Sequence, residues 1–247
     1  MSDTRKKIIL VVPCYNEEER LDKDQFLNSL TKNDELQWLF VNDGSSDNTS
    51  GVIKDLAKKK PDRMYNLDLD QNMGKGEAVR QGLLKALDMN ADITGYFDAD
   101  LATPIPEMLR LIDLTNTTEA KVILGSRAYL LGHDIQRTKM RFFLGRVFAF
   151  VAGILLGIRI NDTQCGAKVL VNHEGLRHSL KNIFISRWLF DIELIHRIYH
   201  HSEAKLSYFY EEPLRKWTDV AGSKIKPSFF LFAIFDLLKI KASLKTR

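Results

Sequence analysis

The chain contains 247 residues, of which 45% are hydrophobic and 28% are charged, proportions that are ordinary for a globular protein. These values exclude a disordered, collagen-like or disulfide-rich chain, and the two cysteines, Cys14 and Cys165, are expected to be reduced and buried. The formal net charge is +4, but residues 214–247 alone carry eight Lys or Arg against two Asp. This basic segment favours an anionic partner: a phosphate compound, a nucleic acid or an anionic membrane.

Strands and helices alternate through the first half of the chain. Short apolar runs predict buried strands, and two stretches with apolar residues at helical spacing lie between them. This alternation predicts an α/β fold in which a mostly parallel central sheet carries helices on both faces and binds ligands beyond the carboxyl ends of its strands. The predicted strands are 8–13, 36–42, 64–69, 93–97 and 121–124, and the predicted helices are 52–60 and 74–89.

The pattern changes near residue 132. The apolar stretch 142–158 contains one charge and three glycines, and it falls short of the roughly 20 uninterrupted apolar residues of a membrane span. We expect one main domain over 1–225, with a possible interfacial helix within 130–160, followed by a basic amphipathic C-terminal helix at 226–247. The further predicted elements are a helix near 186–201, a strand at 205–210 and a lysine-flanked apolar helix at 229–240.

Polar segments follow three of the predicted strands. Each segment alone is typical of a turn, but the carboxyl ends of parallel strands meet at one edge of a sheet. Together they would bring a phenol, an amide and several carboxylates to the predicted binding edge. The segments are Pro13-Cys14-Tyr15-Asn16-Glu17-Glu18, Asn42-Asp43-Gly44-Ser45-Ser46-Asp47 and Asp98-Ala99-Asp100.

Asp98 and Asp100 lie one residue apart after the fourth predicted strand. Two carboxylates at this spacing can reach one hard cation, and Mg²⁺ or Mn²⁺ is typically held by one or two protein carboxylates together with substrate phosphates. The alternative is a pair of loop carboxylates that caps the next helix. We favour a Mg²⁺ or Mn²⁺ site whose ligand shell is completed by a bound diphosphate.

Gly74, Lys75 and Gly76 open the strongest predicted helix. The spacing matches neither G-x-x-x-x-G-K-[ST] nor G-x-G-x-x-G, so it supports neither a P-loop NTPase nor a Rossmann dehydrogenase. Two glycines and a lysine at a helix N-terminus nevertheless suit a phosphate. The alternative is a glycine-led helix start with a solvated lysine.

Eight segments, taken in order, resemble those of family 2 glycosyltransferases with the GT-A fold. The first five are PCYNEE, VNDGSSD, QNMGKGEA, GYFDADLATP and LGSR, and the last three are DTQCGAK (162–168), RWLFDIEL (187–194) and WTDVAGSK (217–224). The last three resemble the dolichyl-phosphate β-glucosyltransferase branch, which is related to polyprenyl-phosphate mannose synthases. The resemblance covers residues 8–224 and implies a nucleotide-sugar-binding fold that transfers a hexose to a lipid phosphate.

The resemblance also implies roles for individual residues. Those on the donor side would bind the nucleotide and a divalent metal, and those on the acceptor side would hold the lipid phosphate. The implied donor residues are Pro13, Tyr15, Asn16, Glu17 and Asp43 at the nucleotide base, Lys75 near the ribose or diphosphate, and Asp98 and Asp100 at the metal and nucleotide sugar. The implied acceptor residues are Arg127, Ser223 and Lys224, with Gln164 and Lys168 facing the acceptor and the donor sugar.

Two departures from the family pattern favour glucose as the transferred sugar. Position 102 is alanine, where mannose synthases usually have a glutamine near the metal, and Trp217 stands where that branch tends to carry an arginine. UDP-glucose is therefore the expected donor, with GDP-mannose as the alternative. Dolichol-dependent members usually carry an N-terminal membrane anchor, which is missing from this sequence, so a prokaryotic-style polyprenyl-phosphate enzyme fits as well as a eukaryotic one.

The implied reaction inverts the anomeric centre and uses a phosphate as the nucleophile. A phosphate monoester is already ionised at pH 7, because its second pKa is about 6. It therefore needs orienting cations, for which Arg127 and Lys224 are suited, more than a strong base. Asp191 lies near where relatives with hydroxyl acceptors place a base. We interpret it as an orienting group, with a base or a helix carboxylate paired with Arg187 or Arg197 as alternatives.

The apolar stretches 142–158 and 229–240 have Lys or Arg on their flanks, as do helices that lie in a bilayer interface. The alternative for each is burial in the core or beneath a partner. We expect a peripheral cytoplasmic protein on the cytoplasmic face of a membrane. Its expected partners are a nucleotide sugar and a polyprenyl or dolichyl phosphate, without nucleic acid, and the sequence identifies no protein partner.

Three other functions stay open as alternatives. A glycosyltransferase with a sugar-hydroxyl acceptor would require an essential carboxylate base. A nucleotidyltransferase would require a glycine- and arginine-rich loop soon after the first strand, which residues 15–21 do not provide. A nucleic-acid-binding protein would interleave basic and stacking aromatic residues along a groove, a pattern to which Trp217 and the C-terminal lysines correspond only faintly.

Overall fold

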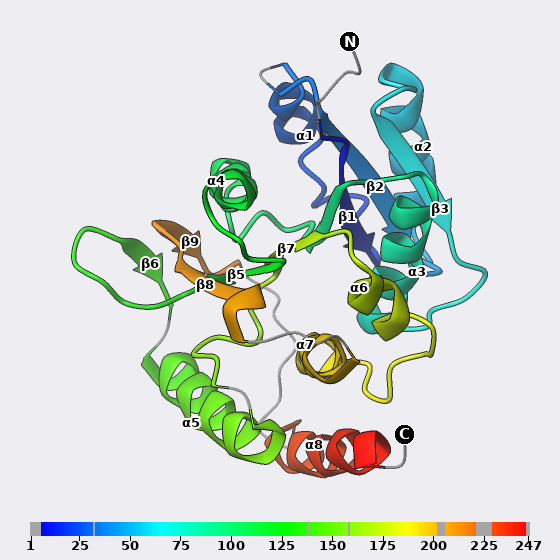
Figure 1. Ribbon diagram of the computed structural model, residues 1–247. Helices are drawn as coiled ribbons and strands as arrows, with labels where there is room; N and C mark the ends of the chain where they lie inside the picture. Colours follow the sequence, from blue (N-terminus) through cyan, green and yellow to red (C-terminus); the bar gives the residue numbers. More distant parts are fainter. Residues whose placement is uncertain are drawn as a thin grey trace.

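The computed structural model describes residues 6–31, 33–137, 139–157, 159–201, 206–220 and 229–245. In this part of the chain, seven strands form a central sheet in the order β3–β2–β1–β4–β7–β5–β8 (Figure 1). Neighbouring strands are parallel, except that β7 runs antiparallel to both β4 and β5. The strands are β1 (Ile8–Cys14), β2 (Leu36–Asn42), β3 (Met64–Asp68), β4 (Ile93–Phe97), β5 (Val122–Ser126), β7 (Ala167–Val171) and β8 (Phe209–Pro213).

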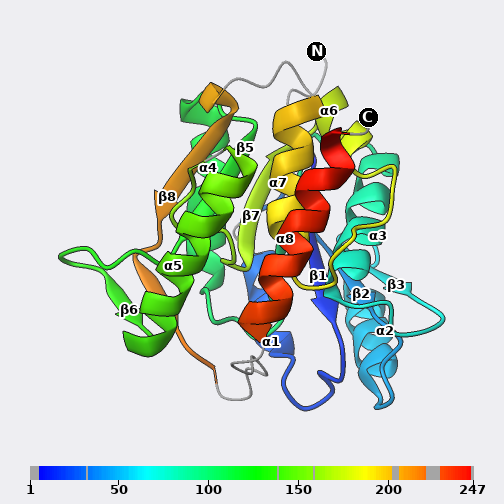
Figure 2. The same ribbon diagram turned by 90° about the horizontal axis from the view of Figure 1, so that it is seen from below.

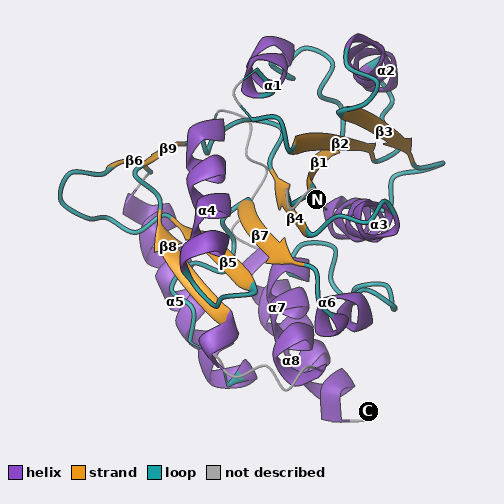
Figure 3. Ribbon diagram, turned by 45° about the horizontal axis from the view of Figure 1, so that its top comes forward, coloured by secondary structure: helices purple, strands orange, loops and turns teal. Residues whose placement is uncertain are grey.

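Helices cover both faces of this sheet (Figure 3). One face packs against α1, α2 and α4, and the other packs against α3, α6 and α7, with α5 and α8 side by side on the outside (Figures 1 and 2). The α/β architecture with a mostly parallel sheet is therefore confirmed. The helices are α1 (Lys23–Ser29), α2 (Thr49–Lys59), α3 (Lys75–Asp88), α4 (Ile105–Thr117), α5 (Lys139–Leu156), α6 (Glu174–Ser179), α7 (Phe190–His201) and α8 (Phe229–Lys245).

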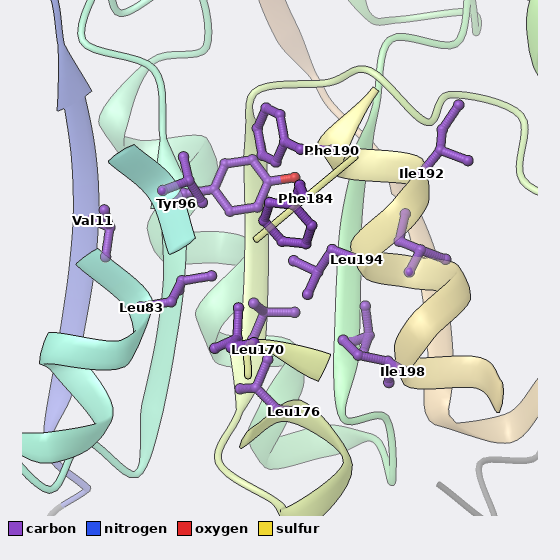
Figure 4. Close-up of a cluster of buried hydrophobic side chains, with 14 of the residues drawn as sticks. Val11, Leu83, Tyr96, Leu170, Leu176, Phe184, Phe190, Ile192, Leu194 and Ile198 are labelled. Carbon is purple, nitrogen blue, oxygen red and sulfur yellow. The ribbon is translucent and has the colours of Figure 1, made fainter. Parts of the chain in front are cut away.

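Each face of the sheet has its own hydrophobic core. Because side chains alternate along a strand, successive residues of β1 enter different cores: Leu10 packs on the α1 side and Val11 on the α3 side. The continuous apolar run of β1 reflects this two-sided burial. Both cysteines are buried and unbridged, as expected. Figure 4 shows the core on the α3 side, in which Leu83, Tyr96, Leu170, Phe190 and Ile198 come from α3, β4, β7 and α7.

The second half differs from the predicted elements, most clearly at β7, β8 and α7. The strand β7 was not predicted from the sequence. It follows a polar segment and pairs with β4 on one side and with β5 on the other. The strand expected at 205–210 lies later, since β8 begins at Phe209. The helix expected from residue 186 begins at Phe190; Ser186 precedes it and accepts a hydrogen bond from the N–H of Leu189 at 3.1 Å.

A small two-stranded sheet, β6 (Asp134–Gln136) and β9 (Lys216–Thr218), lies beside the main sheet. A 3-10 turn at Leu206–Tyr208 leads into β8. Within the ranges that the structure describes, none of the helices has both the length and the apolar character that crossing a bilayer requires.

Candidate active site

The loops after β1 and β2 are joined through Asn16. Its backbone N–H donates to Ser45 Oγ at 3.0 Å, and its Oδ1 accepts from the N–H of Ser46 at 2.9 Å. Asn16 has a φ of 54°, a left-handed conformation that asparagine tolerates better than most residues. Its amide oxygen thus fixes one loop to the other, while the neighbouring Tyr15 side chain is exposed at the same edge.

Asp43 connects the end of β2 to the turn that opens α3. Its two carboxylate oxygens accept from the N–H groups of Met73 at 2.7 Å and Gly74 at 2.9 Å. Burial raises the pKa of Asp43, although these two hydrogen bonds act in the opposite direction. Gly74 has a φ of +93°, which a residue with a side chain rarely adopts. The predicted phosphate corner is therefore a rigid turn held by a buried carboxylate.

Asp98 and Asp100 follow β4 directly, as expected, and lie close to Lys75. The Nζ of Lys75 is 2.5 Å from Asp98 Oδ1. Burial lowers the pKa of Lys75, but the charges of Asp98 and Asp191 outweigh it and raise that pKa overall. Burial and the neighbouring Asp98 raise the pKa of Asp100. A side chain at Gly166 would collide with the Asp98 carboxylate, so a glycine is needed there.

Glu17 contributes a third carboxylate to the electrostatics of this edge. Its Oε2 is buried, has no hydrogen-bond partner in the part of the chain that the structure describes, and lies 3.5 Å from the Nε of Arg20. Burial raises the pKa of Glu17; Arg20 opposes this, and Asp100 adds to it. Pro13 lies just before, in β1, and pairs with Val41 of β2. The predicted donor residues from three strands therefore gather at one edge.

The donor set at this edge fits a hard divalent cation. Asp98 and Asp100 would supply two oxygen ligands, and a cation would offset both the burial and the repulsion from Asp98 that raise the pKa of Asp100. Among the described residues, no group of three or more His, Cys, Asp or Glu side chains is arranged to enclose a metal. Two carboxylates without a closed cage leave coordination positions for a diphosphate, which is how Mg²⁺ is commonly held.

Asp191 lies in a buried polar network beneath the same edge. Lys168 is fully buried, and its Nζ donates to Asp191 Oδ1 at 2.7 Å and to the backbone oxygen of Cys165 at 2.6 Å. Tyr96 donates its hydroxyl to the same Asp191 oxygen. Burial and Asp191 raise the pKa of Tyr96 well above its usual value, so the phenol stays protonated. The alternative partners Arg187 and Arg197 instead contact Asn72 and Glu193.

Arg127 follows β5 and is held by Asp162. Its Nε and NH2 groups donate to the two Asp162 oxygens, both at 2.7 Å, and its guanidinium lies over the Trp217 ring at 5.3 Å. Burial raises the pKa of Asp162, but the charge and hydrogen bonds of Arg127 outweigh this effect and hold that pKa well below its usual range. Trp217 stands where the mannose synthase branch tends to carry an arginine, and here its ring packs against the guanidinium of Arg127.

Three arginines line a pocket at this position. Arg127, Arg137 and Arg146 line a small pocket that is open to solvent, with Asp162 as the carboxylate in its wall. Burial and, to a smaller extent, the charge of Arg127 lower the pKa of Arg137, and the charge of Asp162 opposes them. The segment 162–168 connects this pocket to the edge at Asp98, because Asp162 accepts from Arg127 and the N–H of Asp98 donates to the backbone oxygen of Gly166 at 3.0 Å.

Some candidate functional residues were not identified from the sequence, and some residues that were predicted lie outside the described part of the chain. Arg137 and Arg146 were visible only as basic residues around an apolar stretch, and Arg187 only as a possible partner of Asp191. Gln164 has a buried Nε2 without a hydrogen-bond partner among the described residues, which suits a group that meets a substrate. The predicted residues Ser223 and Lys224 lie outside the described part of the chain.

Comparisons with known proteins agree with this geometry. The family model "Glycosyl transferase family 2" matches residues 9–177. The dolichyl-phosphate beta-glucosyltransferase of Mus musculus is 36% identical over 237 residues, covering 90% of this chain and 70% of the relative. The protein of the same name from Homo sapiens is 32% identical over 241 residues, covering 90% and 70%.

Among solved structures, glucosyl-3-phosphoglycerate synthase from Mycobacterium tuberculosis, crystallised with Mn²⁺ and UDP-glucose, superposes with a TM-score of 0.68. The alignment covers 96% of this chain and 79% of that one at 17% identity, a likeness of fold. The strand edge, the family match and the two relatives lead to one assignment: the chain belongs to glycosyl transferase family 2.

Proposed function

We propose that this protein transfers glucose from UDP-glucose to the phosphate of a dolichyl or another polyprenyl lipid, with inversion at the sugar carbon and with the help of a divalent metal. One observation carries the proposal: the segment 162–168 contacts both the acidic edge and the arginine pocket, because Asp162 pairs with Arg127 and the N–H of Asp98 donates to the backbone oxygen of Gly166 at 3.0 Å. The acidic edge suits the metal of a diphosphate donor, and the pocket suits an anionic acceptor. The names of the mouse and human relatives support glucose and dolichyl phosphate.

On the donor side, Asp98 and Asp100 would hold Mg²⁺ or Mn²⁺. When bound, this ion offsets the charge that develops on the departing diphosphate. Lys75 adds a fixed cation beside Asp98, and the backbone of the Met73–Gly74 turn is held in place by Asp43. The exposed side chain of Tyr15, which precedes Asn16 in the loop after β1, is available to a nucleotide base. The Mn²⁺ and UDP-glucose bound by the mycobacterial neighbour are consistent with this arrangement.

On the acceptor side, a lipid phosphate would bind among the arginines. Arginine is suited to this because its planar fork can donate two hydrogen bonds to one phosphate. A phosphate oxygen forms the new bond to the sugar carbon while the bond from that carbon to the diphosphate breaks, and no proton has to be removed. The sequence positions Ser223 and Lys224 stay candidates for this site.

A hydroxyl acceptor is less well supported, because it would require a carboxylate base. Asp191 is 6% exposed and its Oδ1 accepts from both Lys168 and Tyr96. Both hydrogen bonds already occupy this oxygen, so it is not free to accept the proton of a hydroxyl acceptor. We therefore keep the orienting role for Asp191. A base would lose about 10²–10⁴-fold in turnover and the acid limb of its pH profile on Asp191→Asn, whereas an orienting group keeps that limb.

The donor is tested with a panel of radiolabelled nucleotide sugars, each offered with a polyprenyl phosphate and either Mg²⁺, Mn²⁺ or a chelator. We expect label to enter the organic phase from UDP-glucose with either metal and to stay in the aqueous phase with chelator. Preferential transfer from GDP-mannose would overturn the glucose assignment. Full transfer in the presence of chelator would overturn the role of the metal.

The surface formed by α5 and α8 supports peripheral binding to a membrane. On α5, Phe143, Val147, Phe150 and Ile154 recur at intervals of four and three residues and are 46–70% exposed, so they form one solvent-facing stripe. Phe235 on the adjacent α8 is 60% exposed. Exposed apolar side chains of this kind on two neighbouring helices are typical of helices that lie in a membrane interface.

The same helix α5 joins the stripe to the arginine pocket. Gly145 and Arg146 line the pocket, while Phe143 and Val147, on either side of them in sequence, are exposed. A lipid whose phosphate enters the pocket could therefore lay its chain along α5. We infer that the protein acts on the cytoplasmic face of its membrane, with 1–225 as the catalytic domain and with α8, which lies within 226–247, as the interfacial helix.

Flotation with anionic liposomes tests the membrane surface. Deleting α8 would be ambiguous, because Ala233, Leu237 and Ile240 are buried in the core. The double variant Phe143→Ser with Phe150→Ser should instead lose flotation, and the matched variant Phe143→Leu with Phe150→Leu should keep it. Equal flotation of the serine and leucine variants would overturn the proposed surface.

A further inference from the structure

The loop between α6 and α7 contacts two parts of the molecule that have so far been treated separately. It descends between α8 and α3 (Figures 1 and 2). On the α3 side, Arg187 NH2 donates to the backbone oxygen of Asn72 at 3.2 Å and to its Oδ1 at 2.5 Å. On the α8 side, Ser186 Oγ donates to Asp236 Oδ2 at 2.7 Å. Consecutive residues therefore tie α8 to the turn that opens α3.

Arg187 lies directly on the turn that carries Lys75. A Cβ at Gly74 would collide with the Arg187 Nε, so the absence of a side chain at Gly74 allows the guanidinium to approach. Arg187 also lowers the pKa of Asp43, against the larger raising effect of burial. The arginine is thus a cation at the donor edge, and its placement affects both the turn and the carboxylate that holds it.

Ser186 is buried, and its surroundings fix its position. Its Oγ accepts from the N–H of Leu189 at 3.1 Å, and its own N–H donates to Glu193 Oε2 at 3.3 Å. These bonds hold the start of α7. The hydrogen bond from Ser186 Oγ to Asp236 instead reaches α8, where Asp236 Oδ1 also lies 3.8 Å from Lys239 Nζ. The position of the loop is therefore set by α7 and α8 together.

We propose that Ser186 and Asp236 are positioning residues for the nucleoside diphosphate of the donor, which act by holding Arg187 against the turn that opens α3. The C-terminal helix α8 is then a support of the donor site as well as a surface helix. This inference rests on the proposed function, because it takes the edge formed by Asp43, Lys75 and Asp98 as the donor site.

Asp236→Ala is the most informative change, because it removes the link to α8 and leaves the hydrogen bonds of Ser186 to α7 in place. A hydrogen bond to a charged group is strong enough that its loss can weaken binding by about tenfold. We expect the dissociation constant for UDP to rise by about that factor and KM for the donor to rise with it. The value of kcat at saturating donor should change little, since Asp236 touches no reacting atom.

The test is calorimetric titration of UDP in the presence of Mn²⁺ into wild type, Asp236→Ala, Arg187→Ala and the double variant. If Asp236 acts through Arg187, the double variant binds UDP like Arg187→Ala alone. Asp236→Asn, which keeps an oxygen acceptor for Ser186, should bind close to wild type. Lys239→Ala is the matched control, because it removes the other partner of Asp236 without touching the loop, and its UDP binding should be unchanged.

The inference alone is overturned if Asp236→Ala binds UDP as tightly as wild type, or if its loss of affinity adds fully to that of Arg187→Ala. Equal weakening in Asp236→Asn and Asp236→Ala also contradicts it, because the hydrogen bond would then not matter. A wild-type protein that does not bind UDP at all removes the proposed donor site, and the inference with it. Melting curves recorded on the same samples exclude a loss of binding through unfolding.

Discussion

The proposed donor half of the site, on β1 to β4, and the proposed acceptor half, on β5 to α5, place their side chains in different ways. In the donor half, Asp43 and Asp98 come directly after strands, and Lys75 opens a helix. In the acceptor half, Arg127 follows a strand, but Arg137 precedes α5 and Arg146 lies within it. A parallel sheet edge collects residues that are adjacent to predictable elements, whereas a pocket between packed elements collects residues from wherever the packing brings them.

The largest expected effect lies in the donor half. Asp100→Ala removes one of two predicted metal ligands, and loss of metal assistance costs several kcal/mol in the transition state, which is about 10³-fold in turnover. The measurement is transfer to polyprenyl phosphate at saturating Mn²⁺. Asp55→Ala, which removes an exposed carboxylate of α2, is the control and should stay within a few-fold of wild type. Turnover of Asp100→Ala within tenfold of wild type would remove the metal from this edge.

The largest effect expected in the acceptor half is on stability. Arg127→Met leaves the buried Asp162 carboxylate without its bidentate partner, and breaking a buried ion pair in this way costs about 3–5 kcal/mol. Urea unfolding of the variant measures this cost. The double variant Arg127→Met with Asp162→Leu should recover most of it. A single variant as stable as wild type would mean that the pair is solvated and that the pocket wall is looser than the structure shows.

A smaller and more selective effect is expected at the pocket mouth. Arg137→Ala should raise KM for polyprenyl phosphate by about tenfold, the cost of one charge-assisted hydrogen bond. KM for UDP-glucose should stay unchanged, because the donor half does not use Arg137. Arg215→Ala, on an exposed basic residue between β8 and β9, is the matched control. A parallel rise in both KM values would contradict the division into two halves.

The sequence predicted most of the donor half because its signals are local. Buried strands are continuous apolar runs in the sequence, and a carboxylate pair immediately after such a run lies at the carboxyl end of that strand. The antiparallel strand β7 was missed because the run around Lys168 is short and carries a charge, and only tertiary contacts with Asp191 and Tyr96 make burial of that charge tolerable. The arginine pocket was likewise invisible, since Arg146 looks like one charge within an apolar stretch.

The smallest expected effect concerns pH and the stability of the metal-free protein. The pKa of Asp100 is raised on folding, so the folded state binds its proton more tightly than the unfolded state. Unfolding free energy therefore falls as pH rises through the window between the ordinary aspartate pKa and the raised one. Asp100→Asn removes this cost and should stabilise the metal-free protein by roughly 0.5–1 kcal/mol at pH 7. Calorimetric melting across pH measures it, and an equal or lower stability for Asp100→Asn would contradict the repulsion.

The central claim is that the sugar is transferred to a lipid phosphate held by the acceptor half. The most direct measurement offers labelled UDP-glucose and Mn²⁺ together with either a polyprenyl phosphate or the polyprenol of the same chain length. The account predicts labelled lipid from the phosphate alone, in a form whose sugar is released by mild acid. Comparable labelling of the alcohol would contradict it.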